Sequence, residues 1–519
     1  MPCPEFVSGG IKQLQNLVAS RPLGSRLLLA CCFALLIGEL AAAQSASIGS
    51  ARRAVDKAQV KSPSRQQVRA LFVSDIHFEP FWDPDKVPQL ASAPVSQWKA
   101  ILSAPISRDR IEQFSALQLT CASRGTDTSY SLFDSSLHAM EMAAPDAKFI
   151  TLSGDLIAHS FSCKYKKLMP QSTPEEYRQF VEKTIKFVLD SLRTAFPTAP
   201  VYAALGNNDS DCDDYKLDAN SDFLAQTGGL VAEGFPAPQR RAAQRTFAAE
   251  GYYNVSLPFP LEHTRLLVLD NLFMSRKYTT CSGNADPAGA EAQIDWLRQE
   301  LTEARQKKKR VWVMGHIPPG IDPFSTAIKL RNVCGGKPPD MFLNSDALPN
   351  LLAEFGDVVE LAIFGHTHMD EMRLLKTNVQ DADASQPGVA LKMVPSISPI
   401  DGNMPSFTVA LVDSPSARLA DFQVFASSNE SGSDATWKEE YDYAEAYKQS
   451  DFSAESLTRL VAGFQADPDA STEASKTYLR NYYVRDRSLE LRLFWTQYVC
   501  AVSTYSIDAY RNCRCSKSK

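Results

Sequence analysis

Short runs of apolar residues recur along the chain, and a turn of polar residues follows most of them. Six such runs cover residues 70–73, 149–152, 201–205, 266–269, 311–314 and 361–364. Runs that are apolar without alternation are typical of strands buried on both faces of a sheet. A further run over residues 407–412 is also interpreted as a strand.

Between these runs the apolar spacing changes to that of helices. Thr173 is a helix N-cap residue, with Pro174 at the first helical position and two acids in the first turn. Apolar residues then mark one face up to Leu192. A second helix is expected over about residues 290–305, and the basic run 307–310 is interpreted as its solvated end rather than as a nucleic-acid patch. Strands that alternate with helices predict an α/β core.

The first 43 residues have the pattern of a signal peptide. Arg21 and Arg26 precede an apolar run over residues 27–38, and small residues follow at 41–43. The run is too short to span a bilayer comfortably, so we expect cleavage near Ala43, with an uncleaved signal anchor as the alternative. The leader predicts a secreted or lumenal protein, in an extracellular, periplasmic or lysosome- or vacuole-like compartment, without a transmembrane segment in the mature chain.

The rest of the chain divides into parts that differ in composition and in the spacing of apolar residues. Residues 44–66 are polar without apolar period, which predicts a disordered spacer. Residues 67–426 hold all the strand runs and form the expected catalytic domain. After a Ser-rich stretch at 427–436, residues 437–515 are aromatic and helical in spacing, and we expect a C-terminal helical subdomain there.

Composition and charge exclude two classes of protein. Of the 519 residues, 44% are hydrophobic and 22% are charged, which argues against global disorder. The net charge is −6, whereas a protein that binds duplex nucleic acid needs a basic stripe against the phosphates. We therefore expect a globular protein without a duplex nucleic-acid partner. We also expect a monomer.

Eight cysteines remain once the leader is removed: Cys121, Cys163, Cys212, Cys281, Cys334, Cys500, Cys513 and Cys515. An even number in an exported chain predicts disulfides, and none has the CxxC spacing of a structural zinc site. Cys500 is expected to pair with Cys513 or Cys515, because a short separation makes loop closure easy. Asn254 and Asn429 each begin an Asn-X-Ser triplet that fits N-glycosylation.

Residues with metal-ligand chemistry follow five of the six runs: Asp75, His77, Asp155, Asn207, His316, His366 and His368. The carboxyl ends of the strands in an open α/β sheet share one edge, so these side chains are expected to converge. Carboxylates, imidazoles and an amide oxygen suit Zn²⁺, Mn²⁺ or Fe better than Ca²⁺ or Mg²⁺. Seven ligands are more than one metal needs. We expect two divalent ions, Zn²⁺ foremost, that share one carboxylate.

The ordered set Asp-X-His, Gly-Asp, Gly-Asn-Asn-Asp, Gly-His and Gly-His-Thr-His resembles that of the calcineurin-like metallophosphoesterase superfamily. Within it, residues 286–289, 315–320 and 364–371 and the aromatic tail are similar to acid sphingomyelinase and the acid sphingomyelinase-like phosphodiesterases. The resemblance covers about residues 68–515. It implies an α/β fold in which two central β-sheets form a sandwich flanked by helices, with a C-terminal helical subdomain. The saposin-like domain of acid sphingomyelinase is not expected, because residues 44–66 are too few and too polar.

The same resemblance implies a role for each ligand. One metal would be held by Asp75, His77, Asp155 and His368. The other would be held by Asp155, Asn207, His316 and His366, so that Asp155 is the bridge. The resemblance further implies hydrolysis by a hydroxide between the two metals, and a disulfide between Cys281 and Cys334, since a bridge spans this region in the family.

Position 208 departs from the family pattern. The family usually has a histidine there that helps to protonate the leaving group, whereas Asn208 donates a hydrogen bond but releases no proton at useful pH. In this respect the chain resembles endopolyphosphatase-like relatives, whose leaving group needs less acid help. His159 matches a second histidine of the sphingomyelinase-like pattern and is the candidate acid; the alternative is that it packs beneath the site.

Two charged segments leave the substrate undecided. The lysine-rich stretch 164–167 would favour a polyanion if it is a loop beside the site, and the acidic run 209–214 would repel one unless it is turned outward. The leading hypothesis is a sphingomyelinase-like phosphodiesterase that acts on a lipid or nucleotide phosphoester. The second is a polyphosphate-cleaving or nucleotide phosphohydrolase. The third is a non-catalytic binding protein that kept the metal site, and the complete ligand set argues against it.

Overall fold

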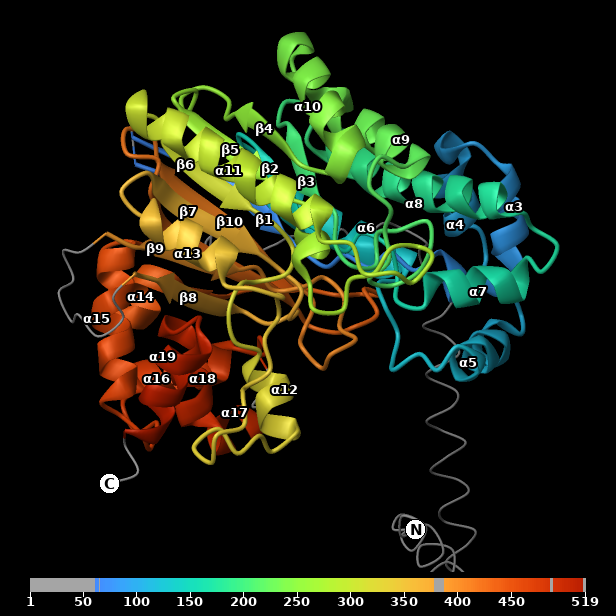
Figure 1. Cartoon of the computed structure of the whole chain (residues 1–519). Helices are drawn as coiled ribbons and strands as arrows, with labels where there is room; N and C mark the ends of the chain where they lie inside the picture. Colours follow the sequence, from blue (N-terminus) through green and yellow to red (C-terminus); the bar gives the residue numbers. More distant parts are fainter. Residues whose placement is uncertain (1–60, 65, 378–386, 486–488, 517–519) are drawn as a thin grey trace, which may run out of the picture. The chain divides into compact units, whose positions relative to one another are not determined.

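Two β-sheets of six strands each lie face to face at the centre of the molecule (Figure 1). The computed structural model describes residues 61–64, 66–377, 387–485 and 489–516. The predicted signal peptide and most of the predicted spacer lie outside these residues. Within them, no helix is long and apolar enough to cross a bilayer.

The first sheet has its parallel strands at one side. Its order is β12 (Trp437–Asp442), β11 (Leu419–Ser427), β10 (Ser406–Asp413), β1 (Gln67–Val73), β2 (Ile150–Ser153) and β3 (Val201–Ala204). The strands β1, β2 and β3 are parallel, and the other pairs are antiparallel.

The second sheet has its parallel strands in the middle. Its order is β4 (Tyr253–Ser256), β5 (Thr264–Val268), β6 (Arg310–Met314), β7 (Val359–Phe364), β9 (Val389–Met393) and β8 (Glu371–Leu375). The strands β5, β6, β7 and β9 run parallel, with the antiparallel strands β4 and β8 at the edges. Each of the six runs interpreted as buried strands overlaps a strand of one of the two sheets.

Aromatic packing joins the two sheets. The Trp312 ring of β6 packs edge-on against Phe72 of β1 and against Phe149 before β2, with ring centroids 5.8 and 5.7 Å apart. All three side chains are fully buried, and the indole N–H of Trp312 donates to the Ala417 carbonyl oxygen at 2.8 Å. The predicted sandwich of two sheets is therefore confirmed.

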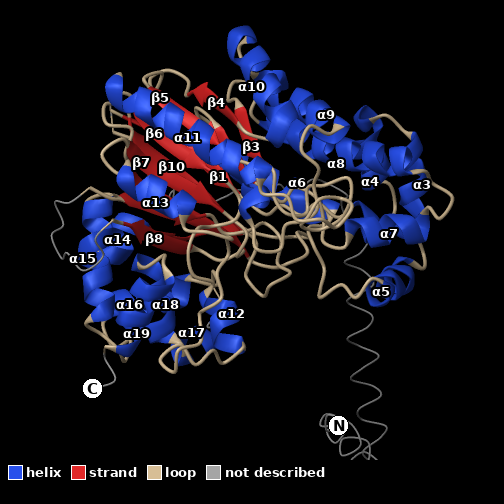
Figure 2. Ribbon diagram, in the orientation of Figure 1, coloured by secondary structure: helices blue, strands red, loops and turns tan. Residues whose placement is uncertain are grey.

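Helices surround the two sheets, and those of the C-terminal part gather beside β8 (Figure 2). Those before residue 260 are α3 (Val87–Ser92), α4 (Trp98–Ser103), α5 (Arg110–Thr120), α6 (Tyr130–Ala143), α7 (Phe161–Leu168), α8 (Pro174–Ala195), α9 (Asp222–Val231) and α10 (Ala237–Glu250). Those after it are α11 (Ala288–Gln306), α12 (Pro323–Ile328), α13 (Ala347–Glu354), α14 (Tyr443–Tyr447), α15 (Ala454–Gln465), α16 (Glu473–Asn481), α17 (Leu489–Leu493), α18 (Trp495–Ser503) and α19 (Ile507–Cys515). Short 3₁₀ turns are Pro80–Trp82, Pro84–Lys86, Val95–Gln97, Ala232–Gly234 and Asn271–Met274.

The two helices expected from local signals are present. In α8, the Thr173 side chain accepts from the Glu176 N–H at 3.2 Å, and the Glu176 carboxylate accepts from the Thr173 N–H at 2.7 Å. This reciprocal capping box satisfies two backbone donors that the first helical turn leaves free. Both predicted helices, α8 and α11, pack on their neighbouring strands, α8 on β3 and α11 on β6.

Two predicted boundaries are wrong: the start of the helical subdomain and the end of the spacer. Residues 437–442, expected as the start of the helical subdomain, form strand β12, which pairs with β11 and so belongs to the first sheet. The spacer prediction also fails at Lys61, whose ammonium group contacts Asp421 and lies 3.1 Å from Asp442. The helical region therefore begins at Tyr443, after the last strand.

Four disulfides cross-link the described chain. They are Cys121–Cys163, Cys212–Cys281, Cys334–Cys515 and Cys500–Cys513. The predicted Cys281–Cys334 bridge is therefore wrong, and the Cys500–Cys513 pair is one of the two that short separation favoured. Cys281 meets Cys212 because the segments around them run side by side: the Tyr215 carbonyl accepts from the Thr279 N–H at 3.1 Å, and the Thr279 carbonyl accepts from the Leu217 N–H at 3.2 Å.

Candidate active site

The seven candidate metal ligands converge at the carboxyl ends of parallel strands from both sheets. Asp75 and His77 follow β1, Asp155 follows β2, and Asn207 follows β3, all in the first sheet. In the second sheet, His316 follows β6, and His366 and His368 follow β7. Their donor atoms form overlapping groups in which Asp155 is shared: Asp75, His77 and Asp155 in one, and Asp155, His316 and His366 in the other.

One oxygen of Asp155 lies between the two groups. Its Oδ2 is 3.4 Å from Nε2 of His77 and 3.2 Å from Nε2 of His316. On one side, His368 Nε2 is 3.1 Å from His77 Nε2. On the other, Asn207 Oδ1 is 3.2 Å from His316 Nε2. All five side chains are buried.

Two of the imidazoles are held in one tautomer by backbone carbonyl groups. The Nδ1–H of His77 donates to the Ile157 carbonyl oxygen at 3.0 Å, and that of His316 donates to the Ser153 carbonyl oxygen at 2.8 Å. Their Nε2 lone pairs then face Asp155 Oδ2, which is unfavourable unless positive charge lies between them. The donor set therefore fits divalent cations.

The pKa values of His316 and Asp155 indicate the same demand for positive charge. Burial alone would lower the pKa of His316, but the carboxylates of Asp155 and Asp75 outweigh it and raise that pKa to about 10. Burial would raise the pKa of Asp155, but His316 and His77 hold it well below its usual range. Without a metal, a proton would occupy part of the place that a cation fills.

Close backbone approach brings these turns together. Gly154 has φ +94°, and a Cβ there would lie 2.6 Å from Nδ1 of His316. A Cβ on Gly206 would overlap the Asp155 carboxylate itself. Glycine at both positions lets the chain turn within contact of the candidate ligands.

Asn208 contacts the shared carboxylate. Its backbone N–H donates to Asp155 Oδ1, and its side-chain amide donates to Oδ2, each at 2.9 Å. The predicted site residue Asn208 therefore lies in the site, as a hydrogen-bond donor to Asp155.

His159 lies against the site and is part of a His–Asp pair. Its ring stacks on His77 with centroids 4.0 Å apart. Its Nδ1 is 3.1 Å from Oδ1 of Asp127, which also accepts from the Ser398 hydroxyl at 2.8 Å. Burial would lower the pKa of His159, but the Asp127 carboxylate outweighs it and raises that pKa to about 9. The side chain is 31% exposed, so this imidazole is oriented by Asp127 and open to solvent.

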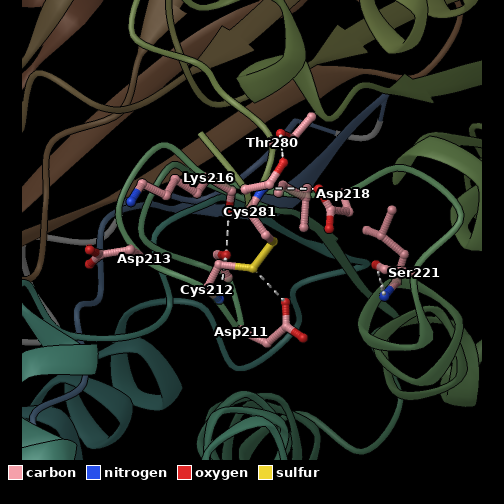
Figure 3. Close-up of a disulfide and its surroundings, with 12 residues drawn as sticks. Asp211, Cys212, Asp213, Lys216, Asp218, Ser221, Thr280 and Cys281 are labelled. Carbon is pink, nitrogen blue, oxygen red and sulfur yellow. Dashed lines mark hydrogen bonds between the residues drawn. A yellow bond between two sulfur atoms is a disulfide. The ribbon is translucent and has the colours of Figure 1, made fainter. Parts of the chain in front are cut away.

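A tyrosine and a lysine border the site on the side of His366. The Tyr215 hydroxyl lies 3.3 Å from His366 Nε2, and Lys277 Nζ donates to the same hydroxyl at 3.3 Å. The Cys212–Cys281 disulfide joins the segments that carry these two residues (Figure 3). The Cys281 N–H also donates to Asp218 at 2.9 Å. Tyr215 and Lys277 are thus fixed beside a candidate ligand.

Asn271 supports the site without being predicted. It follows β5, whose run is the one after which the sequence shows no ligand motif. Its Oδ1 accepts from the N–H groups of His316 and Ile317, both at 3.0 Å, and its side chain is fully buried. Only its place after a strand run marks it in the sequence. Asp127 and Tyr215 likewise lie outside any motif.

The lysine-rich segment is helical, whereas the acidic segment 209–214 is an irregular loop in which Asp213 and Asp214 are exposed. Lys164 and its neighbours lie in α7, and the Lys164 ammonium is buried in an ion pair with Glu79. Asp209, in the acidic run, is also buried, and it accepts from the N–H groups of Leu156, Ile157 and Gly206. Neither Lys164 nor Asp209 is available to attract or repel a substrate, because each already has buried partners.

Residues 68–370 match the family model described as calcineurin-like phosphoesterase. The chain therefore belongs to this family and is a metal-dependent phosphoester hydrolase. The match covers the turns that carry all seven candidate ligands.

Three curated relatives are similar over much of the chain. Human "Acid sphingomyelinase-like phosphodiesterase 3b" is 28% identical over 404 residues, which cover 75% of this chain and 80% of the relative. "Sphingomyelinase phosphodiesterase C" of Dictyostelium discoideum is 25% identical over 299 residues, which cover 57% and 59%. Human "Cyclic GMP-AMP phosphodiesterase SMPDL3A" is 24% identical over 349 residues, which cover 65% and 69%.

Proposed function

We propose that this protein hydrolyses phosphodiesters at a two-metal centre held by the seven converging side chains. The position of Asp155 Oδ2, within 3.4 Å of His77 Nε2 and 3.2 Å of His316 Nε2, carries the proposal, because one oxygen faces both groups. When bound, two divalent cations stabilise the attacking and leaving oxygens and make hydroxide available near neutral pH. Zn²⁺ is our first choice, with Mn²⁺ or Fe as alternatives.

The protein's own residues then orient the shared carboxylate and protonate the leaving oxygen. Asn208 fixes the shared carboxylate through both of its oxygens, which supports a positioning role. His159 protonates the leaving oxygen: Asp127 holds its Nδ1, and the Asp127 carboxylate raises the pKa of the imidazole and so favours its protonated form. The names of the relatives, which include both lipid and nucleotide phosphodiesterases, support a diester substrate.

Four disulfides support an oxidising compartment. We therefore extend the proposal to a secreted or lumenal enzyme, with residues 67–442 as the catalytic domain and the helices after them as its C-terminal cap.

The proton donor is tested by changing the leaving group. His159→Ala should lower kcat on glycerophosphocholine, whose leaving group is an alkoxide, about a hundredfold. On bis-p-nitrophenyl phosphate, whose leaving group needs no acid, the loss should be small. Asp127→Asn should follow the same pattern more weakly. Equal losses on both substrates would show that His159 packs or binds phosphate instead.

A second candidate is hydrolysis of a phosphoanhydride in a nucleotide or polyphosphate. Lys277 favours it, because the Tyr215 hydroxyl lies 3.3 Å from the Lys277 ammonium and 3.3 Å from His366 Nε2. Among the residues that the structure describes, no carboxylate pairs with Lys277. A cation so placed would contact a second phosphate attached to the one undergoing reaction.

Charge removal at Lys277 separates the two candidates. Lys277→Gln should raise KM for tripolyphosphate about tenfold, as expected for one lost charge-assisted hydrogen bond, and should leave bis-p-nitrophenyl phosphate kinetics nearly unchanged. Lys309→Gln is the matched control, since Lys309 precedes β6 at the opposite edge of the sheet. Wild-type protein that does not cleave tripolyphosphate would exclude this second candidate.

A further inference from the structure

An exposed apolar cluster lies on the segment that follows the His316 turn. Phe324 and Ile328 of α12 are 43% and 53% exposed, and Leu330 just after the helix is 78% exposed. Single exposed apolar side chains are common on soluble proteins. Phe324 and Ile328 lie one helical turn apart on α12 and Leu330 follows two residues later. We refer to these three side chains as the patch, since grouped exposed apolar side chains mark contact surfaces.

The same segment is basic. Residues 323–339 contain Lys329, Arg331 and Lys337 and no acid, in a chain whose net charge is −6. Lys329 and Arg331 share one carboxylate, that of Asp340, at 3.3 and 3.1 Å. With the flanking Asp322 and Asp340 included, residues 322–340 carry three basic and two acidic side chains, an excess of one positive charge.

The inner side of this segment is anchored. Ile321 and Val333 are buried in a small apolar cluster with Tyr510. The Cys334–Cys515 disulfide then joins the end of the segment to α19. The apolar side chains that remain exposed are thus held outward on a fixed base.

The base of the segment is also part of the site wall. Phe342 packs edge-on against His366, with ring centroids 5.7 Å apart. The Arg373 guanidinium lies 5.3 Å from the Phe342 ring and donates to the carbonyl oxygens of Pro319 and Ile321 at 3.1 and 2.9 Å. Residues 319–342, which include α12 (Figure 1), therefore connect the patch to the candidate active site at Phe342.

We propose that residues 323–337 dock this protein on an anionic lipid surface. Phe324, Ile328 and Leu330 enter the headgroup boundary, and the three basic side chains contact anionic headgroups around them. Protruding apolar side chains surrounded by Lys and Arg are the chemistry of interfacial segments, which combine apolar burial with attraction to anionic lipid. The proposal concerns binding alone and does not rest on the proposed phosphodiester chemistry.

Co-sedimentation of the full chain with vesicles tests the proposal. We expect wild-type protein to bind phosphatidylcholine vesicles that contain about 30% phosphatidylserine, and to bind pure phosphatidylcholine more weakly. The double variant Phe324→Ser/Leu330→Ser should lower the partition coefficient about tenfold or more. Phe259→Ser is the matched control, because Phe259 is 78% exposed before β5, at the other end of its sheet.

A second pair of variants isolates the charge. Lys329→Gln/Arg331→Gln/Lys337→Gln should reduce binding to the anionic vesicles. Lys307→Gln/Lys308→Gln/Lys309→Gln, which removes three charges from the basic run before β6, should not. Hydrolysis of bis-p-nitrophenyl phosphate by the Phe324→Ser/Leu330→Ser variant at the wild-type rate would show that the site is intact.

Three results would overturn the proposal. Wild-type protein could fail to bind the anionic vesicles, or the patch variants could bind like their controls. The double variant could also convert a wild-type dimer into a monomer in light scattering while vesicle binding stays unchanged, which would make the patch a contact between copies of the chain. Wild-type protein that binds the vesicles but does not hydrolyse bis-p-nitrophenyl phosphate would instead count against the proposed function.

Discussion

Five of the seven candidate ligands have a left-handed backbone. For Asp75, His77, Asp155, His366 and His368, φ lies between 45° and 74°, a conformation that costs non-glycine residues about 1–3 kcal/mol. The cost accompanies sharp turns that direct each side chain over the strand ends. The convergence of the candidate ligands was predictable because residue type and place after a strand are local signals. Asn271 was not, since its function depends on a contact between two turns that lie far apart in the sequence.

The role of Asn271 leads to a prediction. Asn271→Ala removes the acceptor of two buried N–H groups in the His316 turn, each of which costs about 1–3 kcal/mol when left unpaired. We expect kcat on bis-p-nitrophenyl phosphate to fall about tenfold to a hundredfold, because His316 loses its position, with a smaller change in KM. Metal content should fall as well. Asn284→Ala, at an exposed turn, is the control, and a folded Asn271→Ala variant with wild-type kcat and metal content would refute the positioning role.

Elements with local signals were predicted well, and those set by pairing were not. The capping residues and apolar spacing of α8 are encoded within the helix, and the helix forms as expected. Strand β12 has no such signal: Trp437 and Tyr441 are buried because β12 pairs with β11 across a bulge. The Cys212–Cys281 bridge was missed for the same reason, since the contact of its two segments is made only in the fold.

Helix α8 also carries a carboxylate, that of Glu182, whose ionisation destabilises the fold. Burial, opposed by Arg178 and reinforced by Glu175 and the nearby Asp211 and Asp222, raises the pKa of Glu182 to about 7. Its Oε1 has no hydrogen-bond partner in the described chain. Between its ordinary pKa of about 4.3 and 7, the folded state binds a proton that the unfolded state has released, so stability falls as pH rises through this window.

Glu182→Gln should remove that loss. We expect the melting temperature of the variant to exceed that of the wild type at pH 8, with a gain of about 1–3 kcal/mol in the free energy of unfolding, and to match it near pH 4.5. Differential scanning calorimetry at both pH values is the measurement. Glu262→Gln, at an exposed loop, should show no pH-dependent gain. Equal effects at both pH values would contradict the charge argument.

The whole molecule forms its site where two sheets meet. Asp155 comes from the first sheet and His316 from the second, and their side chains approach to 3.2 Å. The order of the motifs indicated that the ligands converge on one strand edge. It did not indicate that they come from two sheets, which only the family resemblance implied. Hydrophobic contacts such as that of Trp312 with Phe72 set the distance between the sheets, and so they set the distance between the two halves of the site.

Replacement of the shared carboxylate tests the central claim most directly. Metal content by mass spectrometry and hydrolysis of bis-p-nitrophenyl phosphate should be measured together for the wild type, Asp155→Asn and the exposed control Asp85→Asn. We predict about two divalent ions per wild-type chain, loss of activity on chelation and recovery on adding metal back. In Asp155→Asn, we predict loss of bound metal and at least about a hundredfold lower activity in a folded protein. A folded Asp155→Asn variant with near-normal turnover and metal content would contradict the two-metal account.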